Sequence, residues 1–266
     1  MQVSRRSLLA GAALAGPAAG APEKTLIIDA HCHAGLGERM SAPWETKADV
    51  EVTLRHMEEA GIDRTIVFPI NNPTYEKANE AIAELCDRHP DKFIGFAKHD
   101  PETEGKRIPA MLRREVEKLG LKGLKLHVLP PRYVLDTVAE LGIPVLYHPE
   151  QVWRYHMIAE EYPQISFIMA HLGSWGSRVW TEHIAAIDVA KRYPNVYVDT
   201  SGVLIFRYLE MAVRELGPDK VIFGSDGPEV DSRVELYKIR LLKLPPQDEA
   251  KILGGNVRRL LPPGTV

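Results

Sequence analysis

The chain has 266 residues, of which 45% are hydrophobic and 26% are charged. This composition is typical of a soluble globular protein and excludes a disordered chain, a collagen-like repeat and a coiled coil. A net charge of -3 without a long basic run argues against a nucleic-acid partner, and two cysteines are too few for a disulfide scaffold.

The first 21 residues have the pattern of an export signal. Arg5 and Arg6 precede a short apolar stretch at residues 8–16, and small residues at 19–21 form a cleavage site. Paired arginines before such a stretch indicate the twin-arginine route, and the stretch is too short to span a bilayer. We expect an exported, periplasmic or secreted protein with no membrane anchor, whose mature chain is residues 22–266. A disordered or start-shifted N-terminus is the alternative.

Short apolar or β-branched runs alternate with longer amphipathic segments along the rest of the chain. The runs that predict strands are residues 25–31, 64–70, 92–98, 121–127, 143–148, 165–171, 195–201 and 220–226. The segments that predict helices are residues 48–60, 74–88, 104–119, 133–141, 151–162, 178–192, 204–216 and 230–242. Eight strand-then-helix units predict an α/β fold with one domain, a single (β/α)8 TIM barrel over residues 22–266.

Ionisable residues gather at the carboxyl ends of the predicted strands. In strand order they are Asp29, His31, His33, His99, Lys125, His127, His148, His171, Asp199 and Asp226. The active site of a (β/α)8 barrel lies at that face, where the strand ends meet. The pattern therefore predicts an active site built from several strands.

The sequence around His31 and His33 predicts a metal site. Side chains alternate along a strand, so these two imidazoles point the same way, and Asp29 is expected to share their side. The side chains expected to face the helices are Leu26, Ile28 and Cys32. Two imidazoles at this spacing can bind one transition metal, and a third imidazole and a carboxylate from other strands would complete the site.

The same alternation predicts a lysine inside the barrel. It turns Leu124 and Leu126 toward the helices and Lys125 and His127 toward the barrel axis. A buried ammonium without a partner is costly. We therefore expect Lys125 to pair with Asp29 or Asp226, to bind a substrate carboxylate, or to be carboxylated and bridge two metals.

Five motifs at the predicted strand ends resemble those of the amidohydrolase superfamily. They are DAHCH (29–33), GLKLH (123–127), LYHPE (146–150), MAHLG (169–173) and FGSDGP (223–228). The set is most similar to the amidohydrolase-related branch of these metal-dependent barrels. That branch includes lactone and amide hydrolases and decarboxylases of the aminocarboxymuconate-semialdehyde type. The resemblance runs from about residue 25 to residue 262.

The resemblance implies a ligand set and two catalytic residues. It implies that His31, His33, His148 and Asp226 bind one divalent metal, most often zinc, although manganese, iron or cobalt suit the same ligands. Such an ion polarises a carbonyl and lowers the pKa of a bound water to about 7. Asp226 is then expected to accept the proton of that water, and His171 to orient the water or to protonate a leaving group.

Five further residues are candidates for supporting the ligands or for binding substrate. They are Lys125, His127, Asp29, Glu150 and Arg132. Glu150 lies two residues after His148, with a plain surface position as the alternative. Arg132 follows two prolines after the fourth strand and is a candidate clamp for a carboxylate.

These observations predict a metal-dependent hydrolase that acts on a small amide, ester or lactone. The alternative within enzymes is non-oxidative decarboxylation of an aromatic or unsaturated acid, which uses the same barrel and ligands. The alternative from another class is a metal-dependent small-molecule-binding protein without turnover. The expected partner is a small-molecule substrate, and a homo-oligomer is compatible with the sequence.

Overall fold

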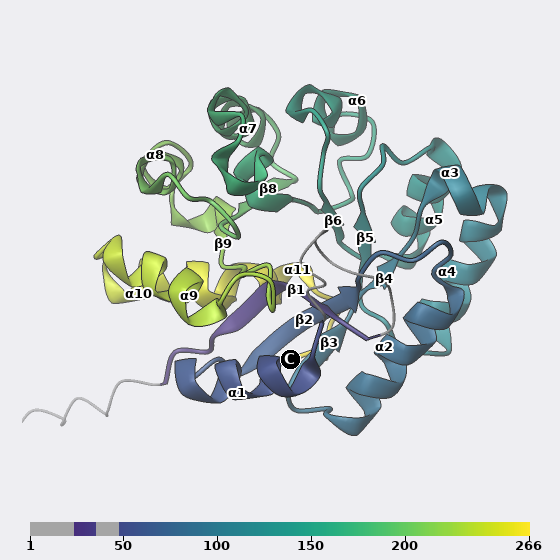
Figure 1. Cartoon of the computed structure of the whole chain (residues 1–266). Coiled ribbons are helices and arrows are strands. Elements are labelled where there is room, and N and C mark those ends of the chain that lie inside the picture. Colours follow the sequence, from purple (N-terminus) through teal and green to yellow (C-terminus); the bar gives the residue numbers. More distant parts are fainter. Residues whose placement is uncertain (1–23, 36–47) are drawn as a thin grey trace, which may run out of the picture.

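The computed structural model describes residues 24–35 and 48–266 (Figure 1). The predicted export signal at residues 1–21 lies outside the described residues, so export stays a prediction. Within those two ranges, none of the helices combines the length and the apolar character that crossing a membrane requires.

Parallel strands form the centre of the molecule. In chain order they are β1 Ile28–Ala34, β2 Arg64–Pro69, β3 Phe93–Gly95, β4 Ala97–Lys98, β5 Leu124–Leu126, β6 Val145–Tyr147, β7 Phe167–Met169, β8 Val196–Asp199 and β9 Val221–Ile222. Strands β1 to β3 pair in sequence order, and so do strands β4 to β9. This order follows from repeated strand-then-helix units, each of which places its strand beside the preceding one.

Backbone hydrogen bonds join the two groups of strands on both sides. Only Phe96 separates β3 from β4, and its N–H donates to the carbonyl of Val67 in β2 at 2.9 Å, so β3 and β4 act as one strand. On the other side, the N–H of Asp226 donates to the carbonyl of His31 at 2.7 Å, which ties the segment after β9 to β1. The described strands thus form the closed (β/α)8 barrel that the sequence predicts.

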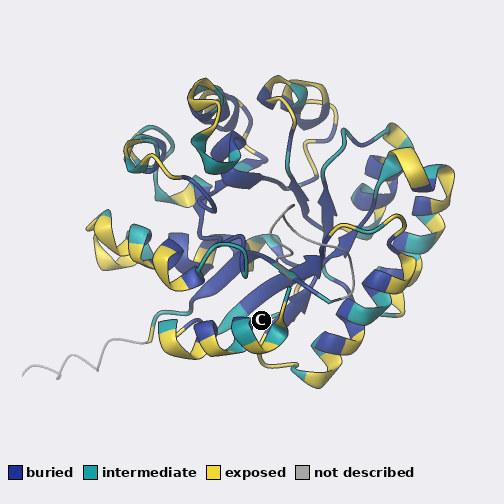
Figure 2. Ribbon diagram, in the orientation of Figure 1, coloured by how far each residue is buried: buried dark blue, intermediate teal, exposed yellow. Residues whose placement is uncertain are grey.

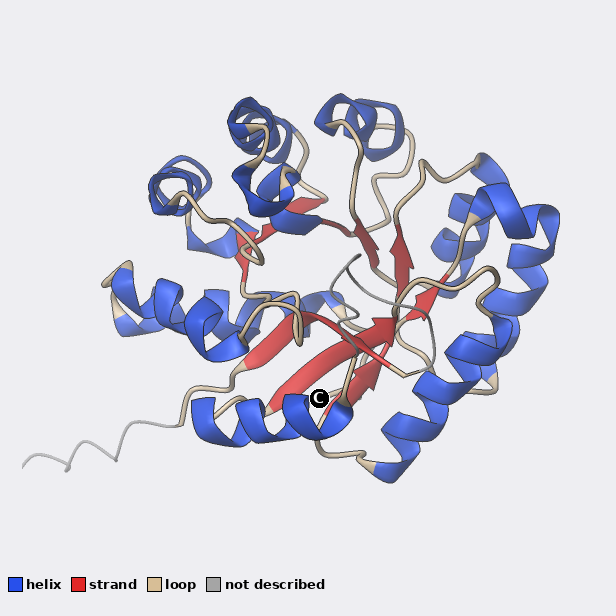
Figure 3. Cartoon of the chain, viewed as in Figure 1, coloured by secondary structure: helices blue, strands red, loops and turns tan. Residues whose placement is uncertain are grey.

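Helices surround these strands (Figure 3). They are α1 Val50–Ala60, α2 Glu76–Arg88, α3 Pro101–Glu104, α4 Ile108–Glu117, α5 Arg132–Leu141, α6 Tyr155–Ala159, α7 Trp180–Arg192, α8 Phe206–Leu216, α9 Ser232–Leu241, α10 Pro246–Ala250 and α11 Asn256–Leu260. Their buried faces turn toward the barrel and their exposed faces outward (Figure 2). The helix predicted at residues 104–119 is divided at Gly105, where φ is 57°, and α4 restarts with Pro109 in its first turn.

A bulge in β1 corrects the predicted alternation of that strand. Asp29 lies opposite Thr65, but Cys32 lies opposite Val67, so β1 contains one more residue than β2 between these pairs. The extra residue reverses the alternation. Ile28 therefore packs inside the barrel, while Cys32 packs in the layer between strands and helices, as predicted. The prediction that Asp29 shares the side of His31 and that Ile28 faces the helices is wrong for this reason.

Candidate active site

A cavity of about 330 Å³ lies at the carboxyl ends of the strands. It is lined by His31, His33, Ile70, Asn71, His127, His148, His171, Trp175, Arg178, Asp226 and Glu229. The histidines come from β1 or directly follow β5, β6 and β7, and Asp226 follows β9. Folding thus brings together the strand-end residues that the sequence analysis singled out, in a space suited to a small molecule.

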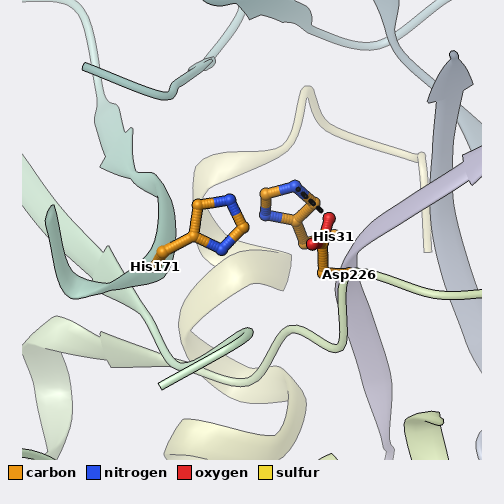
Figure 4. A group of neighbouring side chains, drawn as sticks. All are labelled: His31, His171 and Asp226. Carbon is orange, nitrogen blue, oxygen red and sulfur yellow. Dashed lines mark ion pairs between the residues drawn. The ribbon is translucent and has the colours of Figure 1, made fainter. Parts of the chain in front are cut away.

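Three side chains form the tightest group in this cavity. Ligand atoms of His31, His171 and Asp226 all lie within 4.8 Å of one another (Figure 4). Asp226 Oδ1 lies 3.3 Å from His31 Nε2 and also 3.3 Å from His33 Nε2. The predicted ligand His148 lies next to His171, with their ring centroids 4.5 Å apart. The predicted ligands therefore share one cavity, and His171 belongs to the closest group.

Backbone carbonyls fix two of the imidazoles. His33 Nδ1 donates to the carbonyl of Pro69 at 3.4 Å, and His171 Nδ1 donates to the carbonyl of Ser201 at 3.1 Å. A carbonyl only accepts hydrogen bonds, so the proton of each neutral ring lies on Nδ1. The Nε2 atom of each ring consequently keeps its lone pair, which is the form that binds a metal.

Asp199 positions the third imidazole and part of the surrounding backbone. Its Oδ2 accepts a hydrogen bond from His31 Nδ1 at 2.7 Å. Its Oδ1 accepts from the N–H of His171 at 2.8 Å and from the hydroxyl of Ser201 at 2.6 Å. A carboxylate behind a metal-ligating imidazole fixes the ring and its tautomer. Asp199 lies at the barrel face that the sequence predicts, but its hydrogen bonds to His31 and His171 were not predicted.

Asp226 is held by an indole as well as by the imidazoles. Trp175 Nε1 donates to Asp226 Oδ2 at 2.7 Å, which leaves Oδ1 facing His31 and His33. The backbone of Asp226 is left-handed, with φ at 64°, and that of His171 is too, with φ at 58°. Residues other than glycine adopt this left-handed conformation only with backbone strain. Strained residues of this kind cluster at functional sites. Sequence reasoning missed the role of Trp175 because the two residues are far apart in the chain.

Burial sets the protonation states in the cavity. It lowers the pKa of His31 and His33, and it lowers the pKa of His171 to about 4. Burial alone would raise the pKa of Asp226, but the neighbouring imidazoles outweigh burial and hold it well below its ordinary range. At neutral pH the site therefore presents neutral imidazoles and an ionised carboxylate.

Lys125 places a buried positive charge next to the cavity-lining His31. Its Nζ lies 3.3 Å from His31 Nε2 and 5.0 Å from the centre of the Phe68 ring. Burial lowers the pKa of Lys125 to about 8, although Asp199 and Asp226 counteract this effect. Among the described residues, no carboxylate lies within ion-pair distance of Lys125 Nζ. The predicted pairing with Asp29 or Asp226 is therefore not formed.

Asp29 is buried and His127 is half-buried near the strand ends, and the two have different surroundings. Asp29 accepts a hydrogen bond from the N–H of Ser225 at 2.9 Å, so it joins β1 to the segment after β9 behind the cavity. Burial raises the pKa of Asp29 to about 7, against the effect of the Ser225 hydrogen bonds. His127 lines the cavity, with its ring centroid 5.3 Å from that of His148. His127 therefore remains a candidate for contacting substrate, whereas Asp29 supports the backbone.

The structure places the other two candidates on the surface. Glu150 forms an ion pair with Arg154 at 2.7 Å, and Arg132 forms one with Glu161 at 2.6 Å. The side chain of Arg132 is 72% exposed. Arg132 begins α5 and does not line the cavity at the strand ends. Neither residue lines the cavity, so the roles predicted for Arg132 and Glu150 gain no support from its geometry and stay predictions.

A (β/α)8 barrel with histidines and an aspartate at its strand ends is the arrangement of a metal-dependent barrel enzyme. The family model for amidohydrolases matches residues 28–262. The chain therefore belongs to the amidohydrolase family, and the resemblance seen in the sequence is confirmed.

Known proteins of this fold include decarboxylases and a hydrolase. The chain is 24% identical over 285 residues to a gamma-resorcylate decarboxylase of Polaromonas sp. (strain JS666), covering 78% of this chain and 85% of that protein. It is 19% identical to a 2,6-dihydroxybenzoate decarboxylase solved with 2,6-dihydroxybenzoate, with a TM-score of 0.72, covering 89% of this chain and 99% of that one. A dihydroxybenzoic acid decarboxylase of Polaromonas sp. JS666 with bound manganese is 20% identical, with a TM-score of 0.66 and coverage of 89% and 97%.

The structure of the hydrolase is about as similar to this chain, by TM-score, as those of the decarboxylases. It is a probable 2-pyrone-4,6-dicarboxylic acid hydrolase from Acinetobacter baumannii, 16% identical, with a TM-score of 0.69. The match covers 88% of this chain and 98% of that one. The shared fold thus accommodates both of the reaction types that the sequence left open.

Proposed function

We propose that the chain is a metal-dependent decarboxylase of a small aromatic or unsaturated carboxylic acid. The observation that carries this proposal is Lys125, a buried ammonium that lies 3.3 Å from Nε2 of the cavity-lining His31 and has no carboxylate partner in the described part of the chain. An anionic substrate supplies the missing partner. The decarboxylases among the similar proteins support the same reaction class.

The side chains of the cavity fit a divalent metal. Two Nε2 lone pairs, from His31 and His33, meet the ionised Oδ1 of Asp226 at 3.3 Å each, and a cation relieves the repulsion between these acceptors. His148 or His171 would complete the ligand set. Nitrogen and carboxylate ligands favour zinc and also suit manganese, iron and cobalt. When bound, the metal supplies Lewis acidity that stabilises negative charge on the substrate oxygens.

In decarboxylation, one residue of the chain binds the substrate and others transfer a proton. Lys125 binds the carboxylate and orients it. The C–C bond breaks, carbon dioxide leaves, and the electron pair that remains on carbon must receive a proton. Asp226, ionised and held by Trp175, accepts a proton from a substrate hydroxyl and returns it to that carbon. His171, next to Asp226, is the second group that can move this proton.

Carbon dioxide release tests the proposal directly. Zinc- or manganese-loaded protein is incubated with a panel of hydroxybenzoates and unsaturated acids, with esters, amides and lactones assayed in parallel. Release of carbon dioxide from at least one acid is expected, and a Lys125→Met variant should lower kcat/KM about a hundredfold. A Lys118→Met variant, altered at an exposed lysine, serves as the matched control.

Hydrolysis is the second candidate, because Asp226 is ionised and can also take a proton from water. The similarity to a probable 2-pyrone-4,6-dicarboxylic acid hydrolase favours it. Opening of a lactone, or cleavage of an ester or amide, without carbon dioxide release from any acid would replace decarboxylation by hydrolysis. Ligand binding without turnover on the whole panel would instead favour a binding protein.

A further inference from the structure

We propose that a second cavity, next to the metal pocket, binds a second carboxylate group of the substrate through Lys98. This subsite rests on the proposed function, since it assumes that one acidic substrate occupies both cavities. It defines the substrate class more narrowly, as small acids with two carboxylate groups.

The second cavity adjoins the metal pocket directly. It has a volume of about 230 Å³ and is lined by Asn71, Asn72, Tyr75, Lys98, His99, Asp100, His127 and Val128. Asn71 and His127 line both cavities. These two side chains therefore form a wall that the metal pocket and the cavity of Lys98 share.

Lys98 is a buried cation whose charge is not matched by a nearby anion. The residue is 1% exposed, and its Nζ donates to Asn71 Oδ1 at 3.0 Å and lies 5.3 Å from the centre of the Tyr75 ring. Within residues 24–35 and 48–266, no carboxylate lies within ion-pair distance of this Nζ. An ammonium has three N–H donors, so the Asn71 oxygen leaves donors for a further acceptor.

The neighbouring acidic groups are engaged elsewhere. Asp100 also lines the cavity, but its Oδ1 accepts from the N–H of Glu102 at 2.8 Å and caps α3. Glu104 and Glu115 bind the two ring nitrogens of His99, at 2.8 and 2.7 Å. These carboxylates bind backbone or imidazole groups and form no ion pair with Lys98, although the charges of Asp100 and Asp226 stabilise its ammonium from a distance.

The backbone of Lys98 is held in place by a buried amide. Asn79 Oδ1 accepts from the N–H of Lys98 at 2.9 Å, and Asn79 Nδ2 donates to its carbonyl at 3.1 Å. Asn79 lies in α2 and is fully buried. The ammonium therefore extends from a fixed point of β4 into the cavity, and a carboxylate bound there would meet a preformed site.

Two separate ammonium groups determine the geometry of the ligand. Lys125 lies behind the wall of the metal pocket, 3.3 Å from Nε2 of the lining residue His31, and Lys98 lines the adjacent cavity. Burial lowers the pKa of Lys98 to about 7, and the positive charge of Lys125 adds to this effect. A ligand with one carboxylate neutralises only one of them. A ligand with two carboxylates neutralises both and should bind more tightly.

Equilibrium binding tests the subsite without any need for turnover. Isothermal titration calorimetry on the zinc-loaded full chain compares benzoate with phthalate, isophthalate and terephthalate. At least one benzenedicarboxylate is expected to bind the wild type tenfold or more tightly than benzoate does. A Lys98→Met variant should lose this preference while its affinity for benzoate changes less than twofold. Lys106→Met, altered at an exposed lysine, should keep the preference.

A second variant covers the case in which Lys98→Met does not fold. Asn71→Asp places a carboxylate where the amide oxygen now contacts Lys98 Nζ, and it should abolish the preference by neutralising the ammonium internally. The subsite is refuted if the wild type shows no preference for any dicarboxylate, or if both variants retain it. Absence of carbon dioxide release from every acid would refute the proposed decarboxylation alone, because the binding preference is measured independently.

Discussion

The Asp199 carboxylate uses both of its oxygens to hold other parts of the site. It accepts from His31 Nδ1 at 2.7 Å, from the N–H of His171 at 2.8 Å and from the hydroxyl of Ser201 at 2.6 Å. In an Asp199→Asn variant, an amide nitrogen facing the His31 ring would shift the ring proton to Nε2 and block the metal-binding lone pair. We expect the affinity for zinc to fall about 10- to 100-fold, measured by competition with a chromophoric chelator.

Asp188→Asn provides the control for this experiment, because Asp188 is an exposed aspartate on α7. It should bind zinc as the wild type does. Equal zinc affinities for the Asp199→Asn variant and the wild type would show that Asp199 does not position His31.

At the residue scale, sequence reasoning predicted what strand alternation determines. His31 and His33 line the cavity, and Lys125 lies 3.3 Å from His31 on the same side of the sheet, because their spacing along short strands leaves one orientation. Arg132 does not line the cavity, which could not be predicted because it begins a helix, where position along the chain does not tell which way a long side chain extends. The role of Trp175 toward Asp226 depends on a contact between two loops, and no local pattern encodes it.

Among the elements, β4 is tied to α3 and α4 by one histidine. His99 follows β4, and its ring nitrogens bind Glu104, the last residue of α3, and Glu115 of α4. Burial alone would lower the pKa of His99, but the two carboxylates outweigh burial and raise it from 6.5 to about 9. The imidazolium is therefore the form that joins these elements.

This pKa predicts how stability depends on pH. Because the pKa is higher in the folded chain than in the unfolded one, the stabilisation is complete below about pH 6.5 and is lost as pH rises through about 9. The shift corresponds to about 3 kcal/mol at most. Urea unfolding between pH 6 and pH 9.5 should show this decline in the wild type and not in His99→Gln. An identical decline in both proteins would assign it to other groups.

The contact between the C-terminal helical segment and β1 depends on one glycine. A Cβ atom on Gly254 would lie 2.4 Å from the carbonyl oxygen of Leu26, whereas one on the adjacent Gly255 would lie 3.4 Å from its nearest neighbour. Gly254→Ala should therefore lower the free energy of unfolding by about 1–3 kcal/mol. Gly255→Ala should leave it unchanged or raise it by about 0.5 kcal/mol. Urea midpoints of the two variants check the prediction, and equal midpoints would contradict it.

At the scale of elements, the order of strands and helices could be predicted from the sequence, but two local irregularities could not. Periodicity gave the strands and helices in the right order, since each has an apolar face that must be buried. The bulge in β1 was not predicted, because one inserted residue leaves the alternation of apolar and polar residues intact on either side of it. The division of the segment at residues 104–119 follows from Gly105 and Pro109, which break a helix without interrupting its apolar face.

For the whole molecule, metal binding should contribute to stability. The site exists only in the folded chain, so zinc at a hundred times its Kd adds about 2.7 kcal/mol. In a protein of this size, that corresponds to a rise in Tm of about 5–10 °C. Differential scanning calorimetry with zinc and with a chelator measures the difference. An Asp226→Asn variant should show a smaller rise, and a wild-type Tm that does not respond to zinc would contradict the proposed site.

The hydrogen bond from Asp226 to His31 has a consequence for biosynthesis. It joins the first strand of the barrel to the segment after the last, and the two residues it links are both candidate metal ligands. During translation, His31 and His33 leave the ribosome long before Asp226. A nascent chain therefore holds only part of the ligand set until the ring of strands is complete. Metal acquisition should coincide with the final step of folding, so that an ion retained by the protein reports a finished barrel.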